Sequence, residues 1–501
     1  MADYDVVVIG AGCGGLTAAA LLAKQGRRVL LLEQSELVGG CCSTYERDGY
    51  RFDLGASVIE DVEVIDWAFE RLGTTLNDEV DLITCDPVFN VILRDGTRLK
   101  YPLSSEDTAR EIARTAPGDE KGWNAYAGYM DAFLNKALEG FFLSPANTLT
   151  DVVRMFRRTP GLLRFGPLFL QSYQDVMKRY FKDDRIRESL SFQSFYVGLP
   201  PELCPGHYAM IPYSEHRGLY YTRGGMIQIP AALQRLGEGL GMELRLNTRV
   251  RQVMVRNRRV VGVALADGTE VTADLVVSDI NARQLYLDLV GEEHLPWLAR
   301  VGLKSYEYSM ATPMIYLGVD YQPPLESHHT LATIPMDDTA DFWWNTYKKG
   351  RFPVEQFGII SWTTGSDPAL APEGHHVIVL TLAPGPYRLE GTDWDTEKAA
   401  LQEKIIKYYS DRYIPGLAEH VKVAEFSTPL DFERRLLSPE GAIYALNQDL
   451  TNGIVFRPAA KSKSIRGLYL VGASTHPGGG VPTTIASGMI AADLIEKHEK
   501  G

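Results

Sequence analysis

DVVVIGAGCGGLTAAALLAKQGRRVLLLEQSELVGG, residues 5–40, is the stretch that decides the fold of this chain. The apolar run at 6–9 has the length of a fully buried strand, and residues 16–25 are helix formers without Gly or Pro. A second apolar run, 28–32, ends at Glu33. The stretch therefore predicts a β-α-β unit that opens a doubly wound α/β sheet.

The predicted turn between strand and helix carries glycines in GxGxxG spacing. Gly10 permits the tight turn, Gly12 lets a pyrophosphate approach the backbone, and Gly15 lets the helix pack on the sheet. Gly14 belongs to the same turn, and the helix N-terminus presents free N–H groups to phosphates. Glu33 has the position of the acid that accepts hydrogen bonds from a ribose 2′-hydroxyl. This combination predicts a dinucleotide site but does not separate NAD from FAD.

A second glycine pair, Gly39-Gly40, follows Glu33 and favours FAD. It resembles the glycine pair of flavoproteins in the superfamily of amine oxidases, carotenoid desaturases and Rab GDP-dissociation inhibitors. Residues 45–57, YERDGYRFDLGAS, resemble the corresponding segment of carotenoid isomerases and bacterial-type phytoene desaturases. Within that segment, Gly55 allows close backbone approach to a ligand.

The C-terminal block, residues 465–498, resembles the C-terminal signature of bacterial-type phytoene desaturases. A buried strand ends at Gly472, and Ala473 stands where many FAD proteins have an acid, as it does in the desaturase branch. Gly480 and Val481 open a helix whose N-terminus favours negative charge on a flavin ring. The block therefore predicts the flavin end of the cofactor site.

From about residue 5 to 495 the chain is similar to the bacterial-type phytoene desaturase and carotenoid isomerase family of FAD-dependent oxidoreductases. The family contains desaturases, isomerases, terminal-methyl oxidases and saturases of isoprenoids. The resemblance implies an FAD enzyme that introduces or isomerises double bonds in a long apolar isoprenoid, such as a carotenoid precursor. It also implies oxygen or a quinone as the electron acceptor.

Two alternative functions do not involve the modification of an isoprenoid. A soluble flavin amine oxidase acts on a small polar substrate and usually carries a basic residue where Cys41 stands. A non-enzymatic prenyl-chain binder like the Rab GDP-dissociation inhibitors has lost flavin binding, whereas this chain keeps the glycine turn and Glu33.

The resemblance and the strand pattern together predict three regions. A discontinuous Rossmann-type FAD-binding domain takes residues 1–80, 220–290 and 455–501, and by resemblance a backbone contact near Val250 holds the adenine. An interleaved α+β substrate domain takes 81–103 and 290–455, with a hairpin at Asp95-Gly96 and an antiparallel sheet over 308–385. A helical, membrane-associating region takes 104–219. The segment 189–226, which begins in this region and continues past its end, is crowded with aromatic side chains that suit a polyene channel.

Residues 152–170, VVRMFRRTPGLLRFGPLFL, interleave apolar side chains with Arg154, Arg157, Arg158 and Arg164. In an acidic protein this pattern suits an anionic membrane surface, and an ordinary helix pair with a solvated basic face is the alternative.

The same region supplies the candidate catalytic pair. Asp151 and Arg154 are at i and i+3 of a predicted helix, where they share a face and suit an ion pair. An exposed pair of this kind is usually worth well under ~1 kcal/mol. However, LTDVVRMFRRTP (149–160) resembles the phytoene desaturase segment that carries an Asp and an Arg proposed as acid–base residues near the flavin. By that resemblance only, Asp151 and Arg154 are candidate catalytic residues.

Composition limits the remaining possibilities. The net charge of −13 argues against nucleic acid as the main partner. The five cysteines form no disulfide framework and suggest a reducing compartment, and the vicinal pair Cys41-Cys42 is interpreted as a loop that lines the cofactor. Adjacent histidines on a strand point to opposite faces, so 328–329 and 375–376 predict no metal site. Without a signal segment or an apolar run of about 18 residues, we expect a cytoplasmic protein that meets the membrane peripherally.

Overall fold

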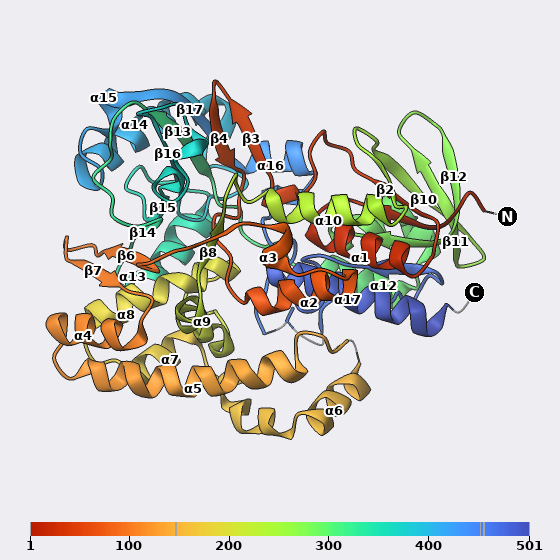
Figure 1. The fold of residues 1–501 in the computed structure, drawn as a ribbon, viewed down its shortest axis with the longest axis horizontal. Helices are drawn as coiled ribbons and strands as arrows, with labels where there is room; N and C mark the ends of the chain where they lie inside the picture. The colour runs from red at the N-terminus through yellow and green to blue at the C-terminus, as the bar shows by residue number, and fades with distance from the viewer. Residues whose placement is uncertain (1, 146–147, 451, 454–455, 500–501) are drawn as a thin grey trace.

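Figure 1 shows the computed structural model of the chain, which describes residues 2–145, 148–450, 452–453 and 456–499. A sheet flanked by helices forms one side of the molecule, a second sheet forms the other, and a group of helices lies beneath the second sheet.

The first sheet is built around the strand of the opening stretch. Its strands are β1 (Tyr4–Ile9), β2 (Val29–Leu32), β9 (Glu243–Arg245), β10 (Val250–Arg256), β11 (Arg259–Leu265), β12 (Glu270–Ser278) and β18 (Leu468–Leu470). The order is β10-β11-β12-β1-β2-β9, with β18 beside the end of β12. β1 runs parallel to β2 and β12, and β18 runs parallel to β12, whereas β10 and β11 form an antiparallel meander with the start of β12. The predicted α/β class is confirmed.

Both faces of this sheet are covered. The helices on one face are α1 (Cys13–Lys24), α2 (Val62–Leu72), α10 (Gln228–Gly239) and α17 (Val481–His498). Val6, Val8 and Leu31 pack into the cluster that contains α1, whereas Val7 and Leu30 pack into a separate cluster on the opposite face. Because residues 6–9 and 29–32 are buried on both faces of the sheet, they appear in the sequence as continuous apolar runs.

The turn between β1 and α1 is closed by its glycines. α1 begins at Cys13, earlier than the predicted residue 16, with Gly12 as its N-cap. A Cβ on Gly15 would lie 2.0 Å from the carbonyl oxygen of Gly10, a separation that no side chain tolerates. The early start places the amides of the first helical turn at the carboxyl edge of the parallel strands.

The second sheet has the order β17-β13-β16-β15-β14-β6-β7. Its strands are β6 (Phe89–Ile92), β7 (Arg98–Tyr101), β13 (Met314–Val319), β14 (His329–Ala332), β15 (Gly358–Ser361), β16 (His376–Thr381) and β17 (Val421–Ser427). The predicted hairpin of β6 and β7 and the antiparallel pairing of β13, β15 and β16 are confirmed. The antiparallel sheet predicted over 308–385 is confirmed, and β6, which lies outside that range, joins it in parallel beside β14. β6 reaches β14 from a distant part of the chain, so no tight turn sets the strand direction.

The remaining elements surround these two sheets. Two short antiparallel pairs join β3 (Thr44–Arg47) to β4 (Tyr50–Asp53) and β5 (Leu82–Thr84) to β8 (Tyr220–Thr222). The other α-helices outside the region 104–219 are α3 (Leu76–Glu79), α11 (Ala282–Gln284), α12 (Trp297–Ser305), α13 (Asp338–Asp341), α14 (Trp394–Arg412), α15 (Leu417–His420) and α16 (Pro429–Leu436).

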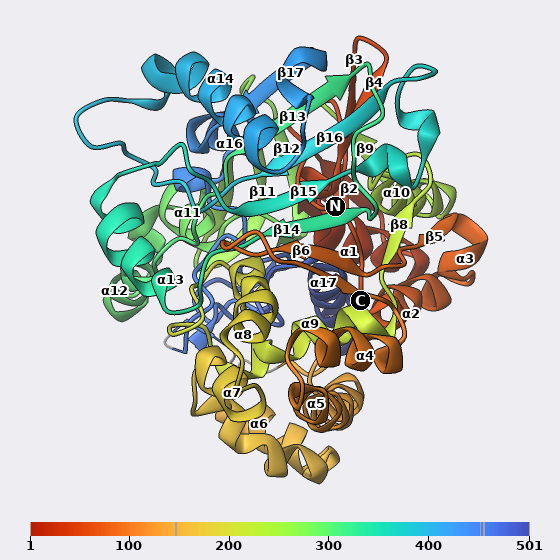
Figure 2. The same cartoon turned by 90° about the vertical axis from the view of Figure 1, so that its left-hand side faces the viewer.

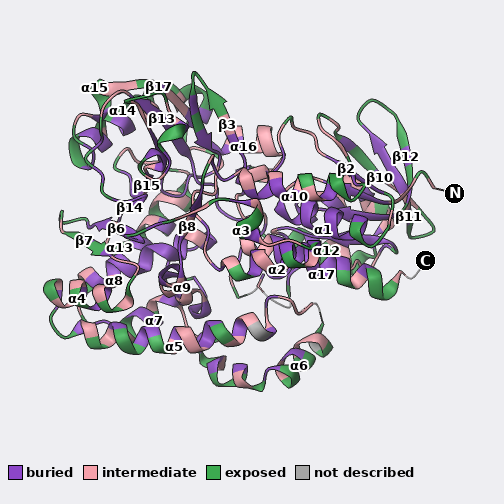
Figure 3. Ribbon diagram, viewed as in Figure 1, coloured by how far each residue is buried: buried purple, intermediate pink, exposed green. Residues whose placement is uncertain are grey.

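The region predicted to be helical is helical. It contains α4 (Ser105–Thr115), α5 (Asp119–Gly140), α6 (Leu149–Arg158), the 3-10 helix η2 (Pro160–Phe169), α7 (Tyr173–Tyr180), α8 (Asp184–Ser191) and α9 (Ile211–Arg217). Figures 1 and 2 both place α6 at the outer edge of the molecule, and Figure 3 shows exposed residues along α4, α5 and α6. Over the described residues, none of the helices has both the length and the apolar content that a bilayer crossing requires.

The strands of the first sheet fall in the three ranges predicted for the FAD-binding domain. The division into three domains stays a prediction, and its boundary at residue 455 lies outside the described residues.

Substituting Gly15 tests the closed turn. We expect Gly15→Ala to destabilise the protein by about 1–3 kcal/mol, because the new methyl group collides with the carbonyl oxygen of Gly10. Thermal unfolding of the purified protein measures the effect. Gly239→Ala is the matched control, since a Cβ there meets nothing within 4 Å. Equal unfolding temperatures for Gly15→Ala and wild type would contradict the closed turn.

Candidate active site

A cavity of about 1070 Å³ is lined by the carboxyl ends of the first sheet, by the second sheet and by the helical region. The predicted cofactor residues that line it are Gly10, Gly12, Gly14, Glu33, Gly39, Gly40, Gly55, Val250, Ala473, Gly480 and Val481. Gly15 and Gly472 lie behind this wall and hold it together. The structure therefore gathers most of the predicted cofactor residues around one space.

Glu33 fixes the nucleotide end of the cavity. One of its carboxylate oxygens accepts the N–H of Ala11 at 2.8 Å, and the other accepts the N–H of Ser35 at 2.9 Å. Arg249 and Val250 line the same cavity from the start of the β10 strand. The carboxylate is therefore held beside the glycine turn, where a ribose hydroxyl would reach it.

Asp279, directly after β12, is a residue that sequence reasoning misses. Its carboxylate accepts the N–H of Gly15 at 2.8 Å. Cβ atoms added to Gly12 and Gly472 would lie 2.5 Å and 1.9 Å from its oxygens. Burial raises the pKa of Asp279 to about 7, the charge of Glu33 adds to this, and the Gly15 N–H opposes it. The pairing of β12 with β1 is the signal that finds Asp279, because carboxyl ends of parallel strands share one edge.

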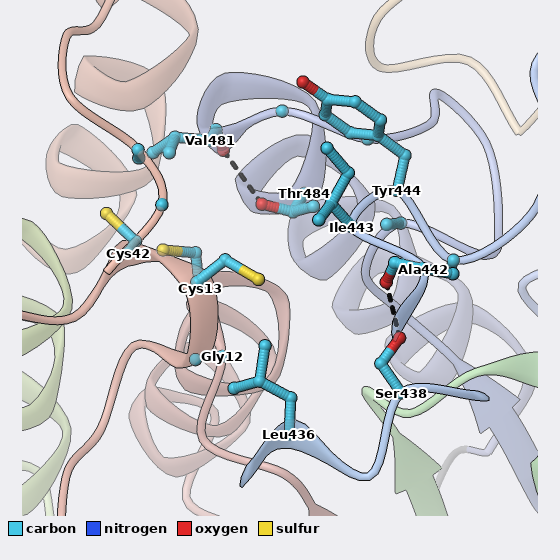
Figure 4. Close-up of a pocket in the computed structure, with 18 of the residues that line it drawn as sticks. Gly12, Cys13, Cys42, Leu436, Ser438, Ala442, Ile443, Tyr444, Val481 and Thr484 are labelled. Atoms are coloured by element: carbon cyan, nitrogen blue, oxygen red, sulfur yellow. Dashed lines mark hydrogen bonds between the residues drawn. The ribbon is translucent and has the colours of Figure 1, made fainter. Parts of the chain in front are cut away.

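The predicted flavin end joins two loops to the start of α17. Gly39 and Gly40 have φ angles of +98° and +57°, and the N–H of Gly39 donates to the carbonyl of Ala11 at 2.7 Å. Gly480 is the N-cap of α17 and has no side chain with which to cap that helix end. Figure 4 shows Val481 and Tyr444 at this end of the cavity. The uncapped helix N-terminus suits a partial negative charge there.

The cysteines near this loop are thiols with raised pKa values. Burial raises the pKa of Cys41, and a hydrogen bond with Cys13 raises that of Cys42 well above its usual value. The Cys42 thiol donates to the carbonyl of Met226 at 3.4 Å. Because a thiol rather than a thiolate is a poor nucleophile, these contacts favour the interpretation of a lining loop.

The residues present fit FAD. The glycine turn leaves a cradle in which a Cβ on Gly12 or Gly14 would collide with neighbouring atoms, and the α1 N-terminus faces it without a side-chain cap from its own N-cap residue. Glu33 would hold the ribose, the α1 amides the pyrophosphate, and the α17 N-terminus the flavin ring.

Beyond the cofactor end the cavity wall becomes mostly apolar. The apolar and aromatic lining residues are Phe142, Phe192, Phe195, Tyr196, Tyr208, Met210, Ile211, Met310, Met314, Phe357 and Ile359. Several come from the aromatic segment 189–226, as the sequence predicts. Two acidic side chains, Glu60 and Glu215, also line this cavity, and the sequence pattern did not single them out.

The structure places the predicted catalytic pair elsewhere. Asp151 and Arg154 line a separate hollow against α17, formed with residues such as Asp493 and Lys497. The Asp151 carboxylate accepts the Arg154 guanidinium at 3.0 Å and the Thr148 hydroxyl at 2.7 Å. These contacts account for Asp151 as part of the N-terminal cap of α6. Their catalytic role stays a prediction, and neither residue lies among those that line the large cavity.

The Glu33 assignment predicts a change in cofactor affinity. We expect Glu33→Ala to weaken FAD binding by about 1.5–3 kcal/mol, because it removes a charged hydrogen-bond acceptor. The dissociation constant of FAD from reconstituted apoprotein measures this. Glu70→Ala, at an exposed position on α2, is the matched control. A wild-type dissociation constant in Glu33→Ala would remove the ribose assignment.

Asp279 predicts a pH dependence of FAD binding. Its raised pKa means that the carboxyl is protonated below about pH 7 and charged above it. A charged carboxylate at the α1 N-terminus repels a pyrophosphate, so we expect FAD affinity to fall as pH rises through 7, by up to about tenfold per pH unit. Asp279→Asn should abolish this dependence, whereas Asp274→Asn at an exposed position of β12 should keep it. The same slope in Asp279→Asn and wild type would contradict the assignment.

Asp151→Asn separates the two roles of the α6 pair. Because Asp151 lies outside the large cavity, we expect turnover and flavin content near the wild-type values. A fall in turnover on the order of 10²-fold with intact flavin content would instead support the acid–base role.

Comparisons with known proteins agree with this geometry. The sequence model of the family described as flavin containing amine oxidoreductase matches residues 13–496 of this chain. The chain is 31% identical to a phytoene desaturase (neurosporene-forming) of Rhodobacter capsulatus, over 99% of this chain and 94% of that protein. It is 30% identical to a phytoene desaturase (lycopene-forming) of Pseudescherichia vulneris, over 98% of each chain.

Solved structures share the fold at lower identity. A putrescine oxidase bound to putrescine has a TM-score of 0.65 at 16% identity, over 98% of this chain and 99% of that one. An oxidoreductase of Methanosarcina mazei has a TM-score of 0.64 at 17% identity, over 98% and 99%. The predicted family, enzyme class and cofactor are confirmed: the chain belongs to the flavin containing amine oxidoreductase family and is an FAD-dependent, phytoene desaturase-like oxidoreductase.

Proposed function

We propose that this enzyme dehydrogenates a long isoprenoid of the carotenoid-precursor type. The observation that carries the proposal is the continuity of the cavity, which joins the cofactor end to a wall of aromatic and aliphatic side chains. A polyene offers few polar groups, so it needs an extended apolar wall for binding. The names of the full-length relatives, several of them phytoene desaturases, support the same substrate class.

The chain's own residues would position the substrate and exclude water. FAD, when bound, supplies the acceptor for the hydride that leaves a saturated carbon. Tyr444 packs against Gly479, where an added Cβ would lie 2.8 Å from its ring, and so bounds the flavin end. Phe192, Phe195 and Phe357 pack against one another on the opposite wall. This arrangement would hold the reacting carbons in a water-poor space.

The electrons of the reduced cofactor would pass to oxygen or a quinone. The sequence contains no second GxGxxG turn for NAD(P)H. An acceptor that diffuses to the cavity fits this sequence better than a second nucleotide site.

We also propose that α6 and η2 contact a membrane surface, which is where a long isoprenoid resides. The side chains of Leu163 and Leu170 are 63% and 87% exposed. Arg157, Arg158 and Arg164 are exposed beside them. Met155, Leu162, Phe165 and Leu168 of the same stretch are buried, so only part of the predicted apolar set is available to lipid.

The reaction is tested with the purified holoenzyme in liposomes that contain phytoene or a C30 analogue. We expect products with additional double bonds, identified by chromatography and absorbance. Isomers without a change in mass would assign isomerisation, and oxygenated or more saturated products would assign the other reactions of this family. Oxidation of a small amine, with no change in either isoprenoid, would overturn the proposal in favour of an amine oxidase.

The membrane proposal predicts salt-sensitive sedimentation with anionic liposomes. Changing Arg157, Arg158 and Arg164 to Gln should weaken binding by roughly 1 kcal/mol per charge, because each charge near the surface contributes about that much. The matched control changes three exposed arginines of the β10–β11 turn, Arg256, Arg258 and Arg259, to Gln. Equal losses in both triple variants would mean that the overall charge, and not the α6–η2 surface, drives binding.

A further inference from the structure

Two carboxyl groups outside the predicted site, Glu60 and Glu215, line the same cavity as the cofactor residues and the aromatic side chains. The negative charge of Glu60 raises the pKa of Tyr444 at the flavin end, after burial as the main cause. The charge of Glu215, together with that of Glu60, does the same for Tyr196 on the aromatic wall. Glu60 therefore lies near both Tyr444 and Tyr196, and Glu215 lies near Tyr196.

Hydrogen bonds hold the segment around Glu60 against the segment around Glu215. The Ser214 hydroxyl donates to the Asp61 carboxylate at 3.1 Å, one residue from each member of the pair. Ile59 and Tyr220 exchange two backbone hydrogen bonds at 2.8 Å and 2.9 Å. The position of the carboxyl pair is therefore built into the fold.

The pair sits among polar groups with spare hydrogen-bonding capacity. Glu215, 1% exposed, accepts the side-chain amide of Gln193 at 3.3 Å. The Oε1 atom of Gln193 and the hydroxyl of Tyr196 are buried, and within the described part of the chain neither has a partner. Burial and the neighbouring acids raise the pKa of Glu60, and burial raises that of Glu215 to about 8. Glu215 is therefore largely protonated at neutral pH, so its carboxyl group and the Tyr196 hydroxyl can donate as well as accept hydrogen bonds.

A pure hydrocarbon in this cavity would leave the Tyr196 hydroxyl and the Oε1 atom of Gln193 unpaired, which costs free energy in a dry site. A ligand with an oxygen at this depth would pair with them. We infer that the cavity recognises an isoprenoid that carries a hydrogen-bonding oxygen, and that Glu60, Glu215 and Tyr196 contact that oxygen. This inference rests on the proposed function and narrows its substrate class.

The test compares two probes on the FAD-loaded enzyme in detergent micelles. The probes are 4,4′-diapolycopene and the same polyene with one terminal hydroxyl group. Quenching of tryptophan fluorescence gives the dissociation constant of each, and their ratio is the readout. Unequal partition of the probes into micelles cancels when ratios from different variants are compared.

We expect wild type to prefer the alcohol, and Glu60→Leu or Glu215→Leu to reduce that preference on the order of tenfold. Glu60→Gln and Glu215→Gln keep shape and hydrogen bonding, and should retain it. Glu63→Gln, at an exposed position on α2, is the matched control. If a Leu variant does not fold, Tyr196→Phe supplies the same test by removing one hydroxyl.

An unchanged ratio in the Leu variants and in Tyr196→Phe, with both probes bound, would overturn the inference and leave the proposed function standing. A loss of FAD content without a change in ratio would overturn it too, by assigning the pair to the cofactor. Putrescine binding that depends on Glu60, with no binding of either polyene, would overturn the proposed function as well.

Discussion

The structure depends on backbone approaching backbone at the carboxyl edge of the first sheet. A Cβ on Gly14 would lie 2.8 Å from the amide nitrogen of Gly472, and one on Gly15 would lie 2.0 Å from the carbonyl of Gly10. Glycine alone removes the side chains that would keep these segments apart. The contact brings the start of α1, the end of β12 and the end of β18 to one point, and Asp279 occupies the space between them. The cofactor end of the cavity exists because of this closeness.

Much of this end could be predicted because its signals are local. The GxGxxG spacing, the apolar runs around it and Glu33 occur within 5–40, and each has one structural consequence that a short stretch can express. The prediction of β-structure in the second sheet had the same basis. It did not reveal that β6 joins this sheet in parallel beside β14, because alternation does not encode a distant partner.

The sequence also failed to mark three acidic residues that line the cavity, for the same physical reason. Asp279, Glu60 and Glu215 are single acids whose surroundings come from segments far apart in sequence, so nothing next to them marks them. Asp151 and Arg154 show the reverse case, because their local pattern is clear and the fold places it beside α17 rather than in the large cavity. An ion pair at i and i+3 indicates a helix reliably. It indicates a catalytic role only where the tertiary structure places it in a cavity.

The first sheet also has a consequence for the order of assembly. β1 leaves the ribosome long before β18, which joins the same sheet from much further along the sequence. At about 5–20 residues per second, the early strands wait roughly 20–90 s for that partner. The helix that follows β18 forms the flavin end, so the cofactor has no complete site during synthesis. Flavin incorporation therefore follows the synthesis of β18. Because the cavity depends on long-range strand pairing, the unfinished chain exposes unpaired strands and is prone to aggregation.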